Sequence, residues 1–154
     1  MKCFAWPVRI YYEDTDHGGV VYYANYLKYT ERCRTEFLRA QGIEQDWLAS
    51  EHDLVFAIHR SEVDYIFPAK FNDLLLVTAR ISRSSRVKLG FEHNIYRMNT
   101  SSSNIAPGFM AHEQIEKDNQ LICRAAITAV SLCASTLRPI RTPKKIFEEL
   151  MREH

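Results

Sequence analysis

YYEDTDHGGVVYYANYLKYTERCRTEFLRAQG, residues 11–42, is the stretch that decides the fold. It joins the end of a strand to an acidic loop with two glycines and then to one long helix. In the loop, Asp14 and Asp16 precede Gly18-Gly19, and the helical pattern begins about one turn later. Because the unpaired amides and the dipole at a helix N-terminus favour negative charge, a carboxylate close to such a terminus is well placed for chemistry.

The segment after the loop has the periodicity of an amphipathic helix. Its apolar face recurs every three or four positions, whereas Lys28 and Arg39 fall elsewhere. The positions on that face are Leu27, Thr30, Cys33 or Arg34, Phe37, Leu38 and Gln41. Asn25 is the expected N-cap and Gly42 the expected left-handed stop. A helix of about 17 residues would span roughly 26 Å, long enough to fill the core of a small domain that a sheet wraps around.

Alternation and turn residues predict the remaining elements. Strands are expected at Ala5–Tyr12, Leu54–Phe67, Leu74–Arg83, Val87–Met98, Phe109–Glu116 and Leu121–Cys133, and helices at Ile43–His52 and after Thr142-Pro143. Ser84-Ser85-Arg86 should join two strands into a hairpin, and Lys117-Asp118-Asn119 should join the last two, after a polar patch at Asn99–Asn104. This order predicts an α+β fold with an antiparallel sheet curled around one helix.

Composition predicts a single domain over residues 1–154 and narrows the function. The chain is 46% hydrophobic and 25% charged, with a formal net charge of +1. Such a balance gives no sign of a polyanion-binding surface, so we expect no nucleic acid partner. No apolar run approaches the roughly 18 residues of a membrane span, and Met1–Pro7 is too short and mixed for a signal peptide. The four cysteines lack metal or redox spacing and predict reduced thiols in the cytoplasm.

The run Y-x-x-D-x-D-x-x-G-V-V-Y-Y-A-N-Y that begins at Tyr11 resembles a known family. Together with the helix it is similar to the acyl-CoA thioesterases of the 4-hydroxybenzoyl-CoA and Tol-Pal-associated type. Val63–Ala69 before Asn72-Asp73, and Ser84-Ser85-Arg86, also match. The resemblance implies the hotdog fold, a homodimer or homotetramer, and an acyl-CoA substrate whose coenzyme A is no retained cofactor. The chain departs from the family by roughly 15 to 20 additional residues after the fourth strand, more than an ordinary loop.

The resemblance implies that Asp16 is the catalytic carboxylate. Thioester hydrolysis needs a group that attacks the acyl carbon or takes a proton from water, and a donor for the developing oxyanion. Asp16 could be nucleophile or base, and the backbone N–H of Tyr23 would be the donor. Tyr23 stands where close relatives of the Tol-Pal-associated group often have histidine. Tyr12 could hydrogen-bond the site or pack in the strand, and Asp14 is expected to be a structural loop residue.

Other nucleophiles and bases are less suited to the role. His17 adjoins Asp16, but neighbouring residues in an extended loop point apart. The remaining histidines show no metal-ligand spacing, so no metal is expected. Cys33 lies on the apolar face of the helix, where a thiol is usually inert.

The expected substrate-binding residues fall into two groups. Gly19, Val21 and Asn25 belong to the loop and the helix start, in register with the family motif. Arg83, Ser85, Arg86 and Lys88 surround the hairpin turn, where basic side chains could meet the phosphates of coenzyme A or simply be solvated. A function from another class also fits the sequence, namely a non-catalytic hotdog subunit that holds acyl groups or supports an envelope complex.

Overall fold

The computed structural model describes residues 1–99 and 105–154. Its strands are β1 (Lys2–Arg9), β2 (Leu54–Tyr65), β3 (Leu74–Ser84), β4 (Lys88–Arg97), β5 (Gly108–Ala111) and β6 (Gln120–Cys133). Its helices are α1 (Asn25–Ala40), α2 (Gln45–His52), α3 (His112–Asp118) and α4 (Lys144–Leu150), with a 3-10 turn at Tyr12–Asp14. Most of the predicted polar patch, residues 100–104, lies outside the described residues.

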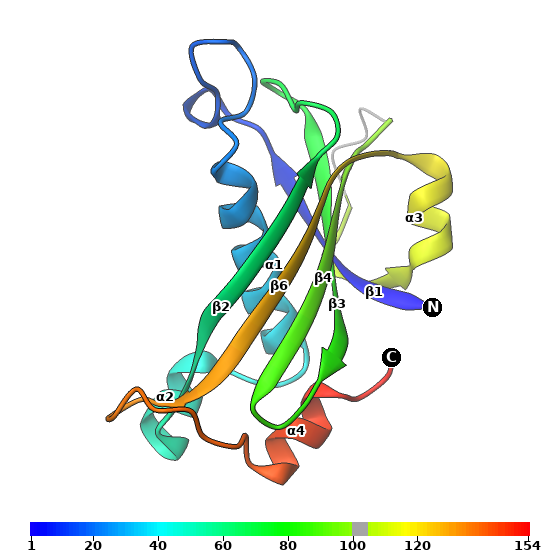
Figure 1. Ribbon diagram of the computed structural model, residues 1–154. Helices are drawn as coiled ribbons and strands as arrows, with labels where there is room; N and C mark the ends of the chain where they lie inside the picture. The colour runs from blue at the N-terminus through cyan, green and yellow to red at the C-terminus, as the bar shows by residue number, and fades with distance from the viewer. Residues whose placement is uncertain (100–104) are drawn as a thin grey trace.

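The described strands form one six-stranded antiparallel sheet in the order β2-β6-β4-β3-β1-β5. The sheet curls around α1, which runs along its concave face (Figure 1). The predicted α+β class, with a sheet wrapped around one central helix, is therefore confirmed. The hairpin of β3 and β4 across Ser84-Ser85-Arg86 is confirmed as well.

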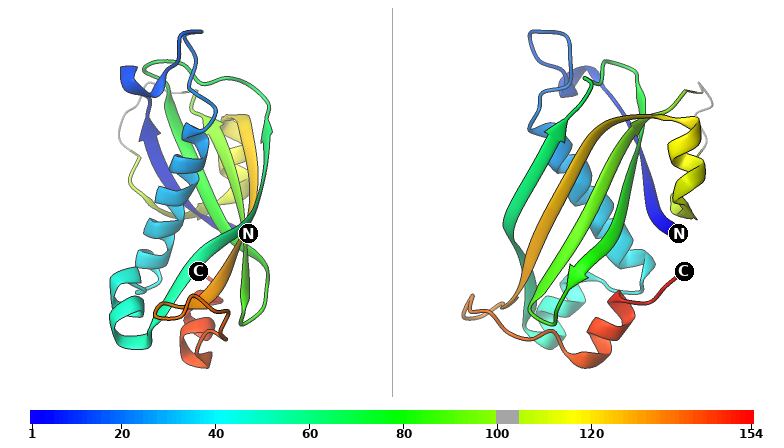
Figure 2. Two further views of the ribbon diagram at one scale, coloured as in Figure 1. Left: turned by 60° about the vertical axis from the view of Figure 1, so that its left-hand side comes forward. Right: turned by 45° about the vertical axis from the view of Figure 1, so that its right-hand side comes forward.

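Apolar side chains pack on both faces of this sheet because successive strand residues point to opposite sides. On β3, Leu75, Val77 and Ala79 join the main core under α1. Leu74 and Leu76 join a smaller core on the opposite face, together with Ile115 of α3. Figure 2 shows the two helices on the two sides of the sheet. The sheet is thus covered on both faces over its β1 half.

Helix α1 begins at Asn25 and ends beside a glycine, much as its sequence predicts. Its 16 residues correspond to a length of about 24 Å. Gly42 has a φ of +79°, which confirms the left-handed stop. The N-cap prediction was wrong, because the cap position is Ala24 and Asn25 is the first helical residue. The Asn25 side chain is used elsewhere, in the loop described below.

The predicted strand Phe109–Glu116 was wrong in its second half. Only Gly108–Ala111 is extended, and His112–Asp118 forms α3 instead. Glutamate, glutamine and lysine dominate that segment and favour a helix once its single apolar residue, Ile115, can be buried on the sheet. The predicted final hairpin is also absent from the described strands, since β5 pairs with β1 and not with β6. The segment after β4 therefore contributes the strand that borders β1.

Candidate active site

Local hydrogen bonds hold the acidic loop against the start of α1. The N–H of Tyr11 donates to the Asp14 carboxylate at 2.8 Å, which fixes the 3-10 turn. The Asp14 carbonyl accepts from the N–H of Tyr22 at 3.0 Å and from the Asn25 side-chain amide at 2.9 Å. Asp14 therefore has the contacts of a structural loop residue, as expected from the sequence. Asn25 is buried and committed to this loop.

Asp16 lies at the exposed tip of the loop. Its N–H donates to the Val20 carbonyl at 2.8 Å, and its carbonyl accepts from Gly19 N–H at 3.0 Å. The loop closes through Gly19, whose φ of +79° favours a residue without a side chain. One carboxylate oxygen of Asp16 accepts from the N–H of Gly18 at 2.8 Å. The other has no hydrogen-bond donor within residues 1–99 and 105–154, so it remains open to water or substrate.

A second loop, residues 68–73, braces the acidic loop. The N–H of Val21 donates to the Ala69 carbonyl at 2.8 Å, and Val20 forms a β-bridge with Lys70. Ala69 in turn donates its N–H to the hydroxyl of Tyr26 on α1 at 3.0 Å. The acidic loop is thus positioned by a neighbouring loop as well as by its own hydrogen bonds.

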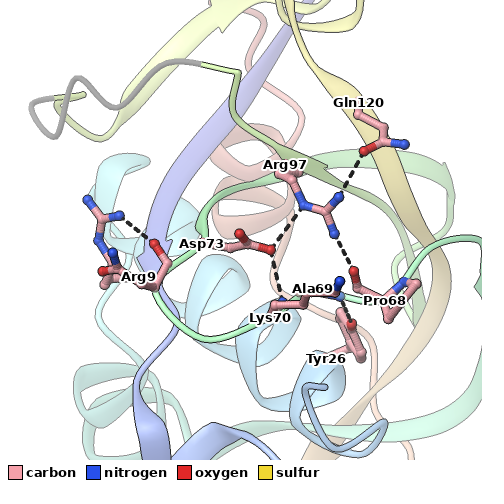
Figure 3. A network of polar contacts seen from close by, with 9 residues as sticks. Arg9, Tyr26, Pro68, Ala69, Lys70, Asp73, Arg97 and Gln120 are labelled. Carbon is pink, nitrogen blue, oxygen red and sulfur yellow. Dashed lines mark hydrogen bonds and ion pairs between the residues drawn. The ribbon is translucent and has the colours of Figure 1, made fainter. Parts of the chain in front are cut away.

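Arg97 at the end of β4 anchors this bracing loop, as Figure 3 shows. Its guanidinium contacts the Asp73 carboxylate at 3.0 Å, the Gln120 side chain at 3.1 Å and the Pro68 carbonyl. Asp73 also accepts from the N–H of Lys70 at 2.9 Å. One partly buried arginine therefore connects both ends of the loop to the sheet.

A shallow depression of about 230 Å³ lies beside the start of α1. Its lining is mostly aromatic and apolar and consists of Val21, Tyr23, Tyr26, Tyr65, Ile66, Phe67 and Pro68. The ring centroids of Tyr23 and Tyr65 are 6.1 Å apart, and the Tyr65 hydroxyl donates to the Tyr23 carbonyl at 3.3 Å. Burial raises the pKa of Tyr26 and of Tyr65 above the ordinary value, so both phenols are neutral donors at physiological pH.

The backbone N–H of Tyr23 has no acceptor in the described part of the chain. It precedes the first residue of α1 by two positions, where the positive end of the helix dipole lies. The Tyr23 side chain is 61% exposed and packs against Tyr22 with ring centroids 5.0 Å apart. A carbonyl oxygen held in the depression could therefore accept from this amide.

The structure brings only part of the predicted site together around the depression. Val21 and Tyr23 line it, whereas Asp16 and Gly19 lie at the loop tip. Tyr12 is 82% exposed, and its ring packs edge-on against Phe71 at 6.2 Å, away from the lining residues. The alternative that Tyr12 packs in the strand was wrong, because β1 ends at Arg9 and Tyr12 begins the 3-10 turn.

The basic turn lies far from the acidic loop within one chain. The 11 residues of β3 connect the bracing loop to the turn, and their rise separates the ends of the strand by about 33 Å. The acidic loop contacts the bracing loop, so the turn is at about this distance from the acidic loop as well. Arg86 Nε donates to the Thr142 carbonyl at 2.9 Å, which ties the turn to the segment before α4. Ser85 Oγ accepts from Lys88 N–H at 3.1 Å and shapes the turn. Arg83 and the Lys88 side chain are exposed, and they have no ion pair among the described residues.

The alternative nucleophile has the environment of a core residue. Cys33 is fully buried, its thiol lies 3.3 Å from the Val77 carbonyl, and burial raises its pKa far above the ordinary value. His17 is exposed at the loop tip. No group of three or more His, Cys, Asp or Glu within residues 1–99 and 105–154 could hold a metal ion. In the same ranges, no helix has the length and apolar character to cross a bilayer.

His93 on β4 is a buried histidine with a structural arrangement. Its Nδ1 lies 2.9 Å from the Thr78 carbonyl and its Nε2 lies 3.2 Å from the Arg34 guanidinium. Burial, with the nearby Arg34 cation, lowers its pKa to about 3. The ring is therefore neutral, with Nδ1–H donating to Thr78 and Nε2 accepting from Arg34.

Sequence reasoning missed the aromatic side chains of the depression and the arginine anchor. Tyr65, Ile66 and Phe67 belong to the segment Val63–Ala69, which resembled the family but was assigned no role at the site. Their type was the available signal, because large apolar side chains that together form an exposed patch often mark a ligand-binding or interaction surface. Arg97 offered no local signal, since its partners lie on three separate segments.

Comparison with known proteins decides the family. Residues 11–150 match the thioesterase-like superfamily. The chain belongs to this superfamily. The acyl-CoA thioesterase YbgC of Haemophilus influenzae is 32% identical over 143 residues, which cover 93% of this chain and 90% of the relative. The YbgC acyl-CoA thioesterase of Helicobacter pylori is 33% identical over 151 residues, covering 98% of each.

Solved structures of thioesterases share the architecture. The 4-hydroxybenzoyl-CoA thioesterase of Pseudomonas sp. strain CBS-3 has a TM-score of 0.79 and 21% identity, covering 97% of this chain and 99% of its own. A probable thioesterase from Bartonella henselae has a TM-score of 0.75 and 28% identity, covering 92% and 99%. The predicted hotdog fold and the prediction that the chain is a thioesterase-family enzyme are thereby confirmed.

Proposed function

We propose that the chain hydrolyses acyl-CoA thioesters to a free carboxylic acid and coenzyme A. The observation that carries this proposal is the Tyr23 N–H, which has no acceptor in the described residues and stands at the start of α1 beside the aromatic depression. The names of the YbgC relatives support the reaction class and the substrate class. Coenzyme A is part of the substrate, and the proposed reaction uses no retained cofactor.

In the proposed mechanism the thioester carbonyl lies in the depression and accepts from the Tyr23 N–H. Asp16, with one carboxylate oxygen open, either takes a proton from the attacking water or attacks the acyl carbon itself. When Asp16 acts as base, the carbon–sulfur bond breaks and the proton that Asp16 took from water passes to the thiolate of coenzyme A. When Asp16 attacks, the same bond breaks and leaves an acyl–Asp16 anhydride, which water then hydrolyses to the free acid and the restored carboxylate, while the released proton neutralises the thiolate. As the carbonyl becomes an oxyanion, the amide and the helix dipole stabilise it. Removing one such donor typically costs about 2.7–4 kcal/mol of barrier.

We further propose that the working enzyme is a homodimer or a homotetramer whose subunits pair through β2. β2 is one edge strand of the described sheet, and the short strand β5, which pairs with β1, is the other. Ile58 and Tyr65 on β2 are about half exposed, which suits a surface that a second copy covers. The four free cysteines support the cytoplasm as the compartment of the enzyme.

The test compares matched loop variants in hydrolysis of a panel of short, long and aromatic acyl-CoAs, followed with a thiol reagent. Asp16→Asn should lower kcat at least about 100-fold at constant shape, and Asp14→Asn should affect kcat less. Tyr23→Pro should lower kcat by roughly 100-fold with the helix intact by circular dichroism, whereas Tyr23→Phe should keep most activity. Hydrolysis unaffected by Asp16→Asn, or absent in the parent protein, would favour a non-catalytic acyl-binding subunit instead.

A further inference from the structure

A second cavity is distant from the acidic loop. It has a volume of about 650 Å³ and lies where the last turn of α1 meets β1, β3, β5 and the residues after α4. Phe37 and Gln41 form its α1 side. The helix rise places Gln41 about 24 Å from Asn25, so this cavity is separate from the depression at Tyr23. Its volume falls within the range of about 300–1,000 Å³ typical of small-molecule sites.

The cavity exists because two neighbouring strands diverge. β1 pairs with β3 only from Phe4, opposite Ala79, onward. Lys2 and Cys3 pair with β5 on the other side of β1 but have no partner on β3, while β3 continues beyond Ala79 to Ser84. On this side, residues 80–82 have no strand partner among the described residues. Their backbone edge therefore faces the cavity with hydrogen-bonding groups that a ligand can use.

Three phenylalanines form the apolar floor. The ring centroids of Phe4, Phe37 and Phe109 lie 5.4–6.1 Å apart in edge-on contacts. His154 stacks on Phe109 at 3.8 Å, and its Nε2 lies 2.5 Å from the side-chain oxygen of the buried Gln41. One wall is thus held by both stacking and a hydrogen bond. Phe4 and Phe37 are buried and Phe109 is partly buried, so an aliphatic or aromatic body would contact mainly Phe109 on this floor.

The charged side chains around the floor are mostly basic. Three lining side chains are cationic, those of Lys2, Arg80 and Arg152, and one is a carboxylate, that of Glu153. The Met1 ammonium also belongs to the lining and is paired with Glu113. Arg80 is paired with Glu92 and Arg152 with Glu149. Lys2 has no ion-pair partner in the described ranges, which leaves it available to an anion. Lys2 shares the sheet face of Phe4, whereas Arg80 shares the opposite face with Leu76. Lys2 is therefore the cation that an amphipathic anion on the apolar floor would meet.

We propose that this cavity binds a free carboxylic acid with an apolar body. The carboxylate would meet Lys2 and the amide edge of residues 80–82, and the apolar body would lie on the apolar floor, mainly against Phe109. Thioester hydrolysis releases free carboxylic acids, so the site would sense the product at a distance from the reaction. This biological role rests on the proposed function. The binding itself requires no catalysis.

The test is a titration of the isotope-labelled protein with decanoate below its micelle concentration, followed by amide chemical shifts. Saturable shifts are expected at residues 80–82 and Phe109, with weaker shifts for decanol, which lacks the charge. Lys2→Glu should weaken decanoate binding at least about 10-fold, because it replaces a charge-assisted contact with repulsion. Lys28→Glu makes the same charge change near the start of α1, about 20 Å along the helix from Gln41, and should leave the affinity unchanged.

Three outcomes would overturn the proposal. They are shifts confined to the Tyr23–Tyr65 depression, the absence of saturable shifts at millimolar decanoate, and equal losses in the two charge-reversed variants. Acyl-CoA hydrolysis is measured separately on the same proteins. An enzyme that hydrolyses acyl-CoA but shows no decanoate shifts at the cavity would contradict only this inference. Decanoate binding without hydrolysis would contradict only the proposed function.

Discussion

Replacing Arg97 with methionine should destabilise the protein and disturb its acidic loop together. Two of the three polar contacts of Arg97 join β4 to the two ends of the loop at residues 68–73, and the third reaches Gln120 on β6. Methionine has a similar length but no donors, so the variant leaves the Pro68 carbonyl and the Asp73 carboxylate without this partner. The bracing loop contacts Val20 and Val21 directly, which connects the change to the site.

The size of the effect follows from the contacts and their exposure. A hydrogen bond to a charged group contributes roughly 1.5–3 kcal/mol, more than an ordinary one. The side chains of Arg97 and Asp73 are 28% and 24% exposed, so solvent screens the pair only in part. With some compensation by water, we expect a loss of about 2–3 kcal/mol in the free energy of unfolding. Because a displacement of about 1 Å at a site can cost roughly 100-fold in rate, kcat should fall too.

The assay is urea unfolding of the parent and two variants, with the slope of the transition checked for constancy. Arg9→Met is the matched control, since Arg9 makes a single exposed contact at 2.8 Å with the Asn72 carbonyl of the same loop. It should cost less than about 1 kcal/mol. If Arg97→Met costs no more than Arg9→Met, or if stability falls while hydrolysis stays at the parent rate, Arg97 does not position the acidic loop.

Three further predictions concern other parts of the molecule. His93 has a pKa lowered to about 3 in the folded protein, so below pH 6.5 the unfolded chain binds a proton on this ring that the folded chain does not bind. The free energy of unfolding should therefore fall by up to about 1.4 kcal/mol per pH unit as the pH drops from 6.5. Urea unfolding of His93→Gln should lack this slope, whereas exposed His59→Gln should keep it. Iodoacetamide should alkylate Cys133 first, because hydrogen bonds, chiefly from Ser135, lower the pKa of its thiol, whereas burial raises the pKa of the other three thiols. Equally fast labelling of the Cys133→Ser variant would contradict this prediction. Replacing Arg83 and Lys88 by alanine, with Arg86 left to hold Thr142, should raise KM for acyl-CoA more than for a thioester without the nucleotide; equal changes would argue against phosphate contacts.

The elements that sequence analysis located well are those whose pattern is local. α1 shows its apolar face every three or four residues, and Gly42 marks its end, so both limits were accessible. The β3–β4 hairpin was equally accessible because two alternating runs flank a short polar turn. β1 was placed about three residues too late, since the apolar tyrosines at 11 and 12 extend the alternation into what is a 3-10 turn.

The features that escaped prediction depend on distant partners. Asn25 looks like an N-cap because its amide suits that role, but the Asp14 carbonyl competes for it across the loop. α3 forms where Ile115 packs into the smaller core on the outer face of the sheet, and the sequence near Ile115 has no pattern that predicts this core. The bracing of the acidic loop by Arg97 joins residues separated by about 30 positions along the chain.

The separation of the acidic loop from the basic turn has a consequence for assembly. The two lie at opposite ends of the sheet, about 33 Å apart, so one chain cannot present Arg83 and Lys88 to a substrate held at its own Tyr23. Antiparallel pairing of β2 with the β2 of a second copy reverses the direction of the partner's sheet. The basic turn of the partner then falls at the same end as the acidic loop of the first chain. The proposed dimer through β2 would therefore complete two equal sites, each built from the catalytic end of one subunit and the basic end of the other.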